Sequence, residues 1–409
     1  MRKLAAIFIV LALLASGIPM SAQRVILGDE QFSAYIPDIE GRKIAIFSNA
    51  SGVVGDKVLS SEGPRLSDKR VFGPHLLDVL LEMDMDVTAV FTPEHGFRMD
   101  ADAGEHVGSQ TDPATGVRIL SLYGKGTDLK SSETMRIFDV LLVDIQDVGL
   151  RYYTYYVTMF KLMDACAAFG KDVIILDRPN PNGFYVDGPI LDVENYRSGV
   201  GWLPIPIVHG MTLGELALMI NGEGWLEGGR QCSLKVVPCR NYKHSDKYEL
   251  IMPPSPNIKS MRAVYLYSST CFFEGTKVSL GRGTQWPFEI YGHPDMSGYG
   301  FSFTPRSIPG AKNPPCLDNE CFGVDLRDKP LAEIWNEGVN LEYVIDAYSA
   351  LSEEGDSFFG SGRFFDLLAG NSWVREMISK GASAEDIKAR WKSDVERFKE
   401  QRRPYLLYP

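Results

Sequence analysis

The sequence is short of positive charge and has no repeated or low-complexity stretch. Its 409 residues hold 42 Lys+Arg against 53 Asp+Glu, a formal net charge of −11. This balance disfavours a nucleic-acid partner, because proteins that bind phosphate backbones carry basic surfaces. The 39 Gly and 24 Pro are scattered and no internal repeat is visible, which argues against fibrous and solenoid architectures. Hydrophobic residues make up 44% of the chain, enough for a large globular core.

Long apolar runs are absent beyond the first 22 residues. The chain begins with Met1, Arg2 and Lys3, continues with an apolar run over residues 4–15, and reaches small residues over 16–22. This order is typical of a signal peptide cleaved after Ala22, and the apolar run is shorter than the roughly 20 residues of a membrane anchor. The mature chain would have a net charge of 40 − 53 = −13 and no membrane span. We expect it to be exported to the periplasm or the cell exterior.

Cysteine is scarce, with six residues in the whole chain. Cys166 and Cys271 lie in apolar helical patterns, where buried free thiols are expected. Cys316 and Cys321 flank a polar loop. If the exported chain forms one disulfide, that pair is the first place to look.

Short apolar segments alternate with helical patterns, which is the signature of a parallel α/β sheet. The segments predicted as strands are 43–47, 87–91, 119–122, 140–145, 173–176 and 206–208, and the predicted helices include 74–82, 155–169 and 212–221. From residue 299 onward several prolines interrupt a polar stretch before further helical patterns begin. We therefore predict an α/β fold, with a parallel-sheet catalytic domain over residues 23–298 and a smaller mixed α/β domain over 299–409.

Polar clusters follow the predicted strands, where parallel sheets bind their ligands. The first is Pro93-Glu94-His95-Gly96-Phe97-Arg98. A carboxylate just beyond a buried strand is partly desolvated, which raises its pKa toward that of a general acid. Glu94 is therefore the first candidate catalytic residue, although a capping role or a pair with Arg98 would explain it too.

The second cluster runs from Asp144 to Tyr153. Strand alternation places Asp147 at the turn, free to face a cleft. Arg151 and Tyr152 beside it resemble a sugar site, in which rings stack on the pyranose and a guanidinium binds an anionic group. The tyrosines would equally suit the buried start of a helix.

Two further clusters contain Asn180, which could be a turn former only, and a glycine-rich loop around Arg282. That loop matches neither a Walker loop nor a dinucleotide fingerprint, so no nucleotide or other cofactor is predicted. No Gly-x-Ser-x-Gly elbow is present. His and carboxylate residues between 94 and 106 are dense, but their spacing fits no metal-binding template, and no metal is predicted.

Taken together, these clusters resemble a bacterial family of exo-β-N-acetylmuramidases of the NamZ type. The resemblance covers almost the whole mature chain: it includes Asn49 with Gly52, residues 93–98, 103–105, 121–124, 144–155, 177–182, 204–210, 273–274 and 281–284. The resemblance implies a Rossmann-like domain and a smaller domain, with the active cleft between them. It also implies hydrolysis of terminal non-reducing N-acetylmuramic acid from peptidoglycan fragments, with Glu94 as the catalytic residue. One departure is the middle of Asn49-Ala50-Ser51-Gly52, where many relatives have Gln and Thr, so the role of Asn49 is open.

Glycoside cleavage uses one protonated carboxyl and one charged group that supports the transition state. We predict Glu94 as general acid and Asp147 as second carboxylate, with a substrate-assisted route through the 2-acetamido group also open. The residues predicted to bind the muropeptide are Asn49, His95, Arg98, Arg151, Tyr152, Asn180, His209, Glu274 and Arg282. Among these, Arg151 and Arg282 are candidates for the lactyl carboxylate with Arg98 in reserve, and Glu274 could replace Asp147.

Two other functions fit the same residues. A metal-dependent hydrolase could be built on Glu94, His95, Asp100, Asp102 and His106, and a chelator would inactivate it. A non-catalytic two-lobed protein could bind a cell-wall sugar without turning it over. Binding of muramic acid without hydrolysis would identify that case.

Overall fold

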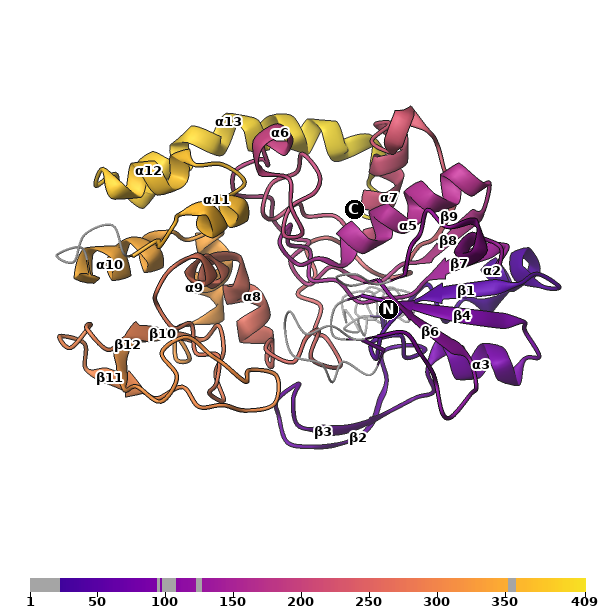
Figure 1. The fold of residues 1–409 in the computed structure, drawn as a ribbon, viewed down its shortest axis with the longest axis horizontal. Coiled ribbons are helices and arrows are strands. Elements are labelled where there is room, and N and C mark those ends of the chain that lie inside the picture. The colour runs from indigo at the N-terminus through magenta and orange to yellow at the C-terminus, as the bar shows by residue number, and fades with distance from the viewer. Residues whose placement is uncertain (1–22, 94–95, 98–107, 123–126, 352–357) are drawn as a thin grey trace, which may run out of the picture.

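The computed structural model describes residues 23–93, 96–97, 108–122, 127–351 and 358–409. A seven-stranded sheet forms the centre of the larger lobe, in the order β5-β6-β4-β1-β7-β8-β9 (Figure 1). All neighbours are parallel except the β5–β6 pair at the edge. The strands are β1 (Ile44–Phe47), β4 (Val87–Thr92), β5 (Gln110–Thr111), β6 (Arg118–Ser121), β7 (Val140–Val143), β8 (Asp172–Leu176) and β9 (Ser233–Val237).

Apart from β5, this sheet has the doubly wound order of a Rossmann fold. The chain builds β1, β4 and β6 outward on one side, then crosses back to place β7, β8 and β9 on the other. The direction of winding changes between β1 and β7, and ligands bind such sheets beyond the carboxyl ends of the strands at that point. The α/β fold class is confirmed.

The central strands are apolar throughout because both faces of the sheet are covered. In β1, Ala45 and Phe47 belong to one core cluster, and Ile44 and Ile46 to another. The first cluster includes residues of α5 (Tyr155–Phe169) and α7 (Leu213–Gly222), and the second residues of α2 (Phe32–Ile39) and α3 (Leu76–Glu82). Strand alternation thus directs successive side chains to opposite helical layers.

The predicted strands and helices of this lobe are confirmed with one exception. Residues 206–208 form no strand; Val208 makes isolated bridges with Leu150 and Asp187. The predicted capping box is present, since Thr212 accepts from the backbone of Glu215 and the Glu215 side chain accepts from the backbone of Thr212. The remaining short elements here are α4 (Ser132–Met135), α6 (Val193–Tyr196), η1 (Glu227–Gly229) and a hairpin of β2 (Val58–Glu62) and β3 (Lys69–Phe72).

The smaller lobe combines helices with an antiparallel sheet in the order β10-β12-β11. Its elements are α8 (Met261–Thr270), η2 (Cys271–Gly275), β10 (Ile290–His293), β11 (Phe301–Phe303), β12 (Cys321–Asp325), α9 (Leu331–Glu337), α10 (Glu342–Leu351), α11 (Arg363–Ala369), α12 (Trp373–Ser379), α13 (Ala384–Arg402) and η4 (Arg403–Tyr405). The predicted boundary at 298/299 divides this sheet, because β10 precedes it and β11 and β12 follow it. The smaller lobe begins earlier in the chain than the proline-rich stretch indicated.

The last helix returns the chain to the larger lobe. In Figure 1, α13 runs from α12 in the smaller lobe toward α7. Beyond it, the Tyr408 hydroxyl donates to Asp177 Oδ2 at 2.5 Å, and Asp177 directly follows β8. The carboxyl terminus is therefore anchored beneath the ligand-binding edge of the sheet. Within the described ranges, no helix combines the length and apolarity needed to cross a bilayer.

Candidate active site

The carboxyl edge of the sheet gathers polar segments from four adjacent strands. Ser48 and Asn49 follow β1, Pro93 follows β4, Asp144 follows β7, and Asp177 follows β8. Their neighbours in the sequence include the predicted site residues Glu94, His95 and Arg98. These three lie outside the described residues, as do Asp100, Asp102 and His106 of the metal-site alternative.

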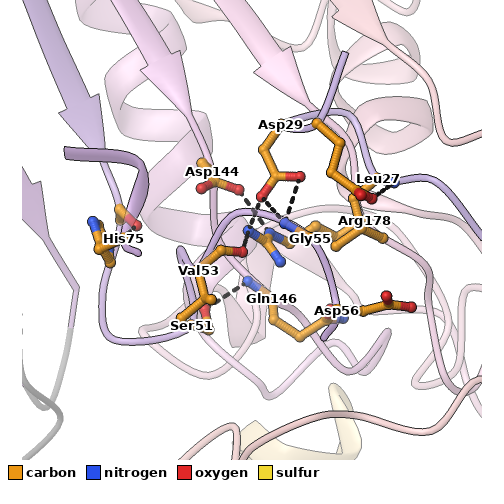
Figure 2. Close-up of polar contacts among 12 residues, drawn as sticks. Leu27, Asp29, Ser51, Val53, Gly55, Asp56, His75, Asp144, Gln146 and Arg178 are labelled. Atoms are coloured by element: carbon orange, nitrogen blue, oxygen red, sulfur yellow. Dashed lines mark hydrogen bonds and ion pairs between the residues drawn. The ribbon is translucent and has the colours of Figure 1, made fainter. Parts of the chain in front are cut away.

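A buried ionic group joins several of these segments (Figure 2). Arg178 donates from Nε to Asp144 Oδ1 at 2.7 Å and from Nη2 to Asp29 Oδ2 at 2.8 Å. Nη2 also donates to the carbonyl of Val53 at 3.0 Å, and Asp29 accepts from the backbone N–H of Gly55. Burial raises the pKa of Asp29, although Arg178 opposes this. One guanidinium thus holds the N-terminal segment, the β1 loop and the end of β7 in a fixed relation.

Asn49 is committed to the loop that follows β1. Its Nδ2 donates to the Tyr155 hydroxyl at 2.9 Å, and its Oδ1 accepts from the N–H and hydroxyl of Ser51. Ser51 Oγ in turn accepts from the backbone N–H of Gln146 at 3.0 Å. Asn49 is fully buried and these partners are all protein groups, so the structure shows a loop-forming role for it, and its role as a substrate ligand stays a prediction.

A neighbouring Ser48–His75 contact resembles half of a nucleophilic pair but cannot act as one. His75 Nδ1 accepts from the Leu77 N–H, so Nε2 carries the proton and donates to the Asn49 carbonyl at 2.9 Å. Ser48 Oγ lies 3.4 Å from the same Nε2, which therefore has no lone pair to accept the serine proton. Burial also lowers the pKa of His75.

Asp147 is buried with one oxygen unpaired. Its side chain lies at the turn after β7, as predicted, and the residue is 7% exposed. Oδ1 accepts from the Gly149 N–H at 2.6 Å, whereas Oδ2 has no hydrogen-bond partner among the described residues. Burial raises the pKa of Asp147 to about 7. The carboxyl lines a cavity of about 10 Å³ together with Asn180 and Thr212.

Arg151 and Tyr152, predicted as part of a sugar site, are interior residues. Arg151 is fully buried, and its guanidinium donates to the carbonyls of Pro189, Ile205 and Leu368. These contacts join the larger lobe to α11. The Tyr152 hydroxyl donates to two backbone carbonyls of α8. Both side chains therefore connect the lobes, and Arg151 Nε has no hydrogen-bond partner among the described residues.

His209 and Asn180 also contact protein groups, although His209 Nε2 has no hydrogen-bond partner among the described residues. His209 Nδ1 accepts from the Met211 N–H at 3.2 Å, and burial lowers the pKa of this imidazole to about 3, so it stays neutral. Asn180 donates from Nδ2 to the Met211 carbonyl and accepts from the Asn182 N–H. The alternative of a turn former therefore describes Asn180 better than a substrate ligand does.

Glu274 and Arg282 keep accessible surface. Their side chains form an ion pair at 2.6 Å and are 23% and 19% exposed. Arg282 uses Nη2 in this pair. It lies between Gly281 and Gly283, whose positive φ angles form the tight loop. Among the predicted binding residues that the structure describes, Glu274 and Arg282 have side chains exposed enough to contact a ligand directly.

The sequence reasoning missed Asp29 and Arg178. The signal available was weak: a lone Asp shortly after the predicted signal peptide and an Arg within a turn-forming stretch. In the parts of the chain with described coordinates, no group of three or more His, Cys, Asp or Glu side chains could hold a metal ion.

Known proteins resemble this chain over both lobes. The family model described as "Exo-beta-N-acetylmuramidase NamZ, N-terminal" matches residues 68–262, and "Exo-beta-N-acetylmuramidase NamZ, C-terminal" matches 265–408. The two matches meet at the start of α8. Peptidoglycan beta-N-acetylmuramidase NamZ of Bacillus subtilis (strain 168) is 37% identical over 393 residues, which cover 91% of this chain and 89% of that protein.

Two crystal structures of DUF1343 family proteins from Bacteroides fragilis NCTC 9343 share the fold. One is 56% identical with a TM-score of 0.83, and the other is 26% identical with a TM-score of 0.76. Each comparison covers 94% of this chain and 99% of the other. Together with the matches to both halves, these similarities show that the chain belongs to the NamZ family of exo-β-N-acetylmuramidases.

Proposed function

We propose that this protein is a glycoside hydrolase that releases terminal non-reducing N-acetylmuramic acid from peptidoglycan fragments. The observation that carries the proposal is the match of both lobes, in order, to the two halves of the muramidase family. The fold supports the proposal, because ligands bind doubly wound sheets at the carboxyl ends of their strands and acidic side chains lie at that edge here. The reaction needs two acidic groups, and the proposed pair is Glu94 and Asp147.

Asp147 is suited to hold a proton near neutral pH. A pKa of about 7 leaves half of these carboxyls protonated at pH 7, in the range at which general acids work. Because Oδ2 is buried, its proton reaches the substrate through a relay, and the adjoining cavity of about 10 Å³ has room for about one water molecule. In this proposal Glu94 remains the general acid at the sugar, and Asp147 is the second acidic group that exchanges a proton with it, so the two acids together set the pH dependence.

Arg282 is the proposed partner of the lactyl carboxylate. That group distinguishes N-acetylmuramic acid from N-acetylglucosamine, and a guanidinium recognises a carboxylate through paired N–H donors. Arg282 uses one nitrogen for Glu274 and keeps other donors for a ligand. Glu274 fixes the direction of the guanidinium. Arg151, whose terminal nitrogens donate to backbone carbonyls, is not included in this proposal.

We also propose that residues 1–22 direct export, as their order of charged, apolar and small residues indicates. Peptidoglycan lies outside the cytoplasmic membrane, so an exported enzyme meets this substrate directly. Edman sequencing of the protein recovered from its native host should begin at Gln23. An intact N-terminus in a cytoplasmic fraction would contradict export.

The test of activity is release of the chromophore from a chromogenic N-acetylmuramide. The wild type should hydrolyse this substrate. The kcat/KM of Glu94→Gln should be at least about 100-fold lower. The kcat/KM of Asp147→Asn should no longer change with pH near 7. Glu400→Gln, an exposed carboxylate on α13, serves as the matched control and should be unchanged. Full activity of Glu94→Gln would remove Glu94 from the mechanism. Saturable binding without turnover by the wild type would favour a binding protein, and loss of activity with chelator a metalloenzyme.

A further inference from the structure

Cys316 and Cys321 lie together in the smaller lobe. Cys321 begins β12 opposite Phe303 of β11, and both cysteines belong to the small apolar cluster around Ile290. The chain between them reverses direction, because the Asn319 N–H donates to the Cys316 carbonyl at 3.0 Å. Cys316 packs against the small cluster that contains Cys321, and the two thiols shift each other's pKa in opposite directions. A short turn therefore holds both cysteines in the same small cluster.

The two thiols differ in a way that suits disulfide exchange. Cys316 is partly exposed, and the hydrogen bond from Cys321 lowers the pKa of its thiol. Cys321 is buried, and its pKa is raised by the same hydrogen bond and by burial. The accessible sulfur is thus the better thiolate, which is the form that attacks a disulfide. The other four cysteines are buried with raised pKa values and are inert by comparison.

We propose that Cys316 and Cys321 form an intramolecular disulfide when the chain meets a disulfide oxidant, such as glutathione disulfide or the disulfide of a thiol oxidoreductase. The Cys316 thiolate attacks one sulfur of the oxidant and releases its first thiolate. Cys321 then gives up its proton and attacks the Cys316 sulfur of the mixed disulfide, which releases the second thiol. Two protein thiols lose two electrons in total, and the oxidant's disulfide gains them as two thiols.

The bond would fix a turn that contacts the loop carrying Arg282. Cys316 Sγ lies 3.7 Å from the carbonyl of Lys277, at the start of that segment. Farther along, the Asp318 N–H donates to the Pro305 carbonyl, and the Arg306 N–H donates to the Gly283 carbonyl, both at 2.9 Å. A disulfide within the turn reduces the conformational freedom of the unfolded chain around these contacts. It would persist in the oxidising compartment that the proposed export implies.

The test is thiol counting on the purified protein after incubation with glutathione disulfide or with dithiothreitol. Denaturation, alkylation and mass spectrometry should show six labelled cysteines in the reduced protein and four in the oxidised one, with Cys316 and Cys321 joined in one peptide. The oxidised protein should melt about 3 °C above the reduced one. Cys316→Ser should abolish both differences, and Cys232→Ser, which removes a buried thiol elsewhere, should retain them.

Three results would overturn the proposal: six labelled cysteines after oxidation, a stable glutathione adduct on Cys316 in the wild type, or a disulfide that involves another cysteine. The readout is the mass of the protein and needs no turnover. Failure of the disulfide and failure of the muramidase assay are therefore separate outcomes. Cys321→Ser provides the second variant, because it should trap Cys316 as the mixed disulfide that the exchange requires.

Discussion

Replacement of Asp147 by Asn should make the folded protein more stable at pH 8 while it impairs catalysis. In the native state, burial raises the pKa of Asp147 to about 7, whereas an unfolded Asp titrates near 3.9. The native state therefore holds the proton more tightly, and the stability contributed by this group is greatest below about pH 4 and falls as pH rises toward 7. The asparagine side chain does not titrate, so it adds no such loss of stability to the variant between pH 4 and pH 7.

The magnitude follows from the difference of about three pKa units. At about 1.4 kcal/mol per unit, ionised Asp147 costs the native state about 4 kcal/mol at pH 8. This is a ceiling, since relaxation of the loop and entry of water reduce the cost. Asn keeps the acceptor for the Gly149 N–H but places an NH₂ group at the unpaired Oδ2 position, which costs about 1 kcal/mol or more. We expect a net gain of about 2 kcal/mol at pH 8 and none at pH 4.

Urea unfolding of both proteins at pH 4, 6 and 8 measures the difference, and kcat/KM over the same range measures the catalytic cost. Asp144→Asn is the matched control from the same strand end. It should destabilise at pH 8, because Asp144 is paired with Arg178. Equal destabilisation by Asp147→Asn at all three pH values would refute the reasoning, since it would mean that the carboxylate is a structural acceptor only.

Three other substitutions test neighbouring contacts. Arg178→Met should cost about 3–5 kcal/mol in urea unfolding, because Asp29 and Asp144 lose their buried counter-charge; a cost below 1 kcal/mol would contradict this. Tyr408→Phe should cost about 1.5–3 kcal/mol by removing the hydrogen bond to buried Asp177, and an unchanged unfolding midpoint would show that the C-terminal anchor is unimportant. Arg282→Gln should lower kcat/KM for a chromogenic N-acetylmuramide about 10- to 100-fold, with little effect on the N-acetylglucosaminide; equal losses on both substrates would exclude recognition of the lactyl group.

The sheet was predictable because its central strands are buried on both faces and read as continuous apolar runs. The same criterion failed for residues 206–208, which are apolar and buried but pair with no strand beyond isolated bridges. The criterion does not describe β9 either, in which Ser233 and Lys235 are exposed at the sheet edge. Burial of an apolar segment does not by itself specify sheet pairing, and an edge strand need not be apolar.

The site was less predictable because its contacts join distant parts of the sequence. Asp147 could be placed at a turn from strand alternation alone. The Arg151 guanidinium donates to the Leu368 carbonyl, 217 residues away in the sequence, and Arg178 donates to Asp29, 149 residues away. An arginine among aromatic residues indicates a ligand site in a local reading, whereas the fold uses this one to join two lobes. Local pattern thus identified the polar segments that gather at the carboxyl edge of the sheet but could not show which of their side chains are committed to protein contacts across the chain.

The buried charges at this edge are better explained by positioning than by stability. A buried ionic group often contributes no more to stability than apolar residues of the same size, since desolvation offsets the attraction. Arg178 nevertheless supplies directed bonds to two carboxylates and to the Val53 carbonyl, which apolar residues cannot supply. These bonds fix loops that lack regular structure, and a site on loops needs such support to keep its geometry. The ionic group is therefore the element that preorganises the end of this Rossmann-like sheet, next to Asp147, whose Oδ2 has no partner among the described residues and which we propose carries a proton.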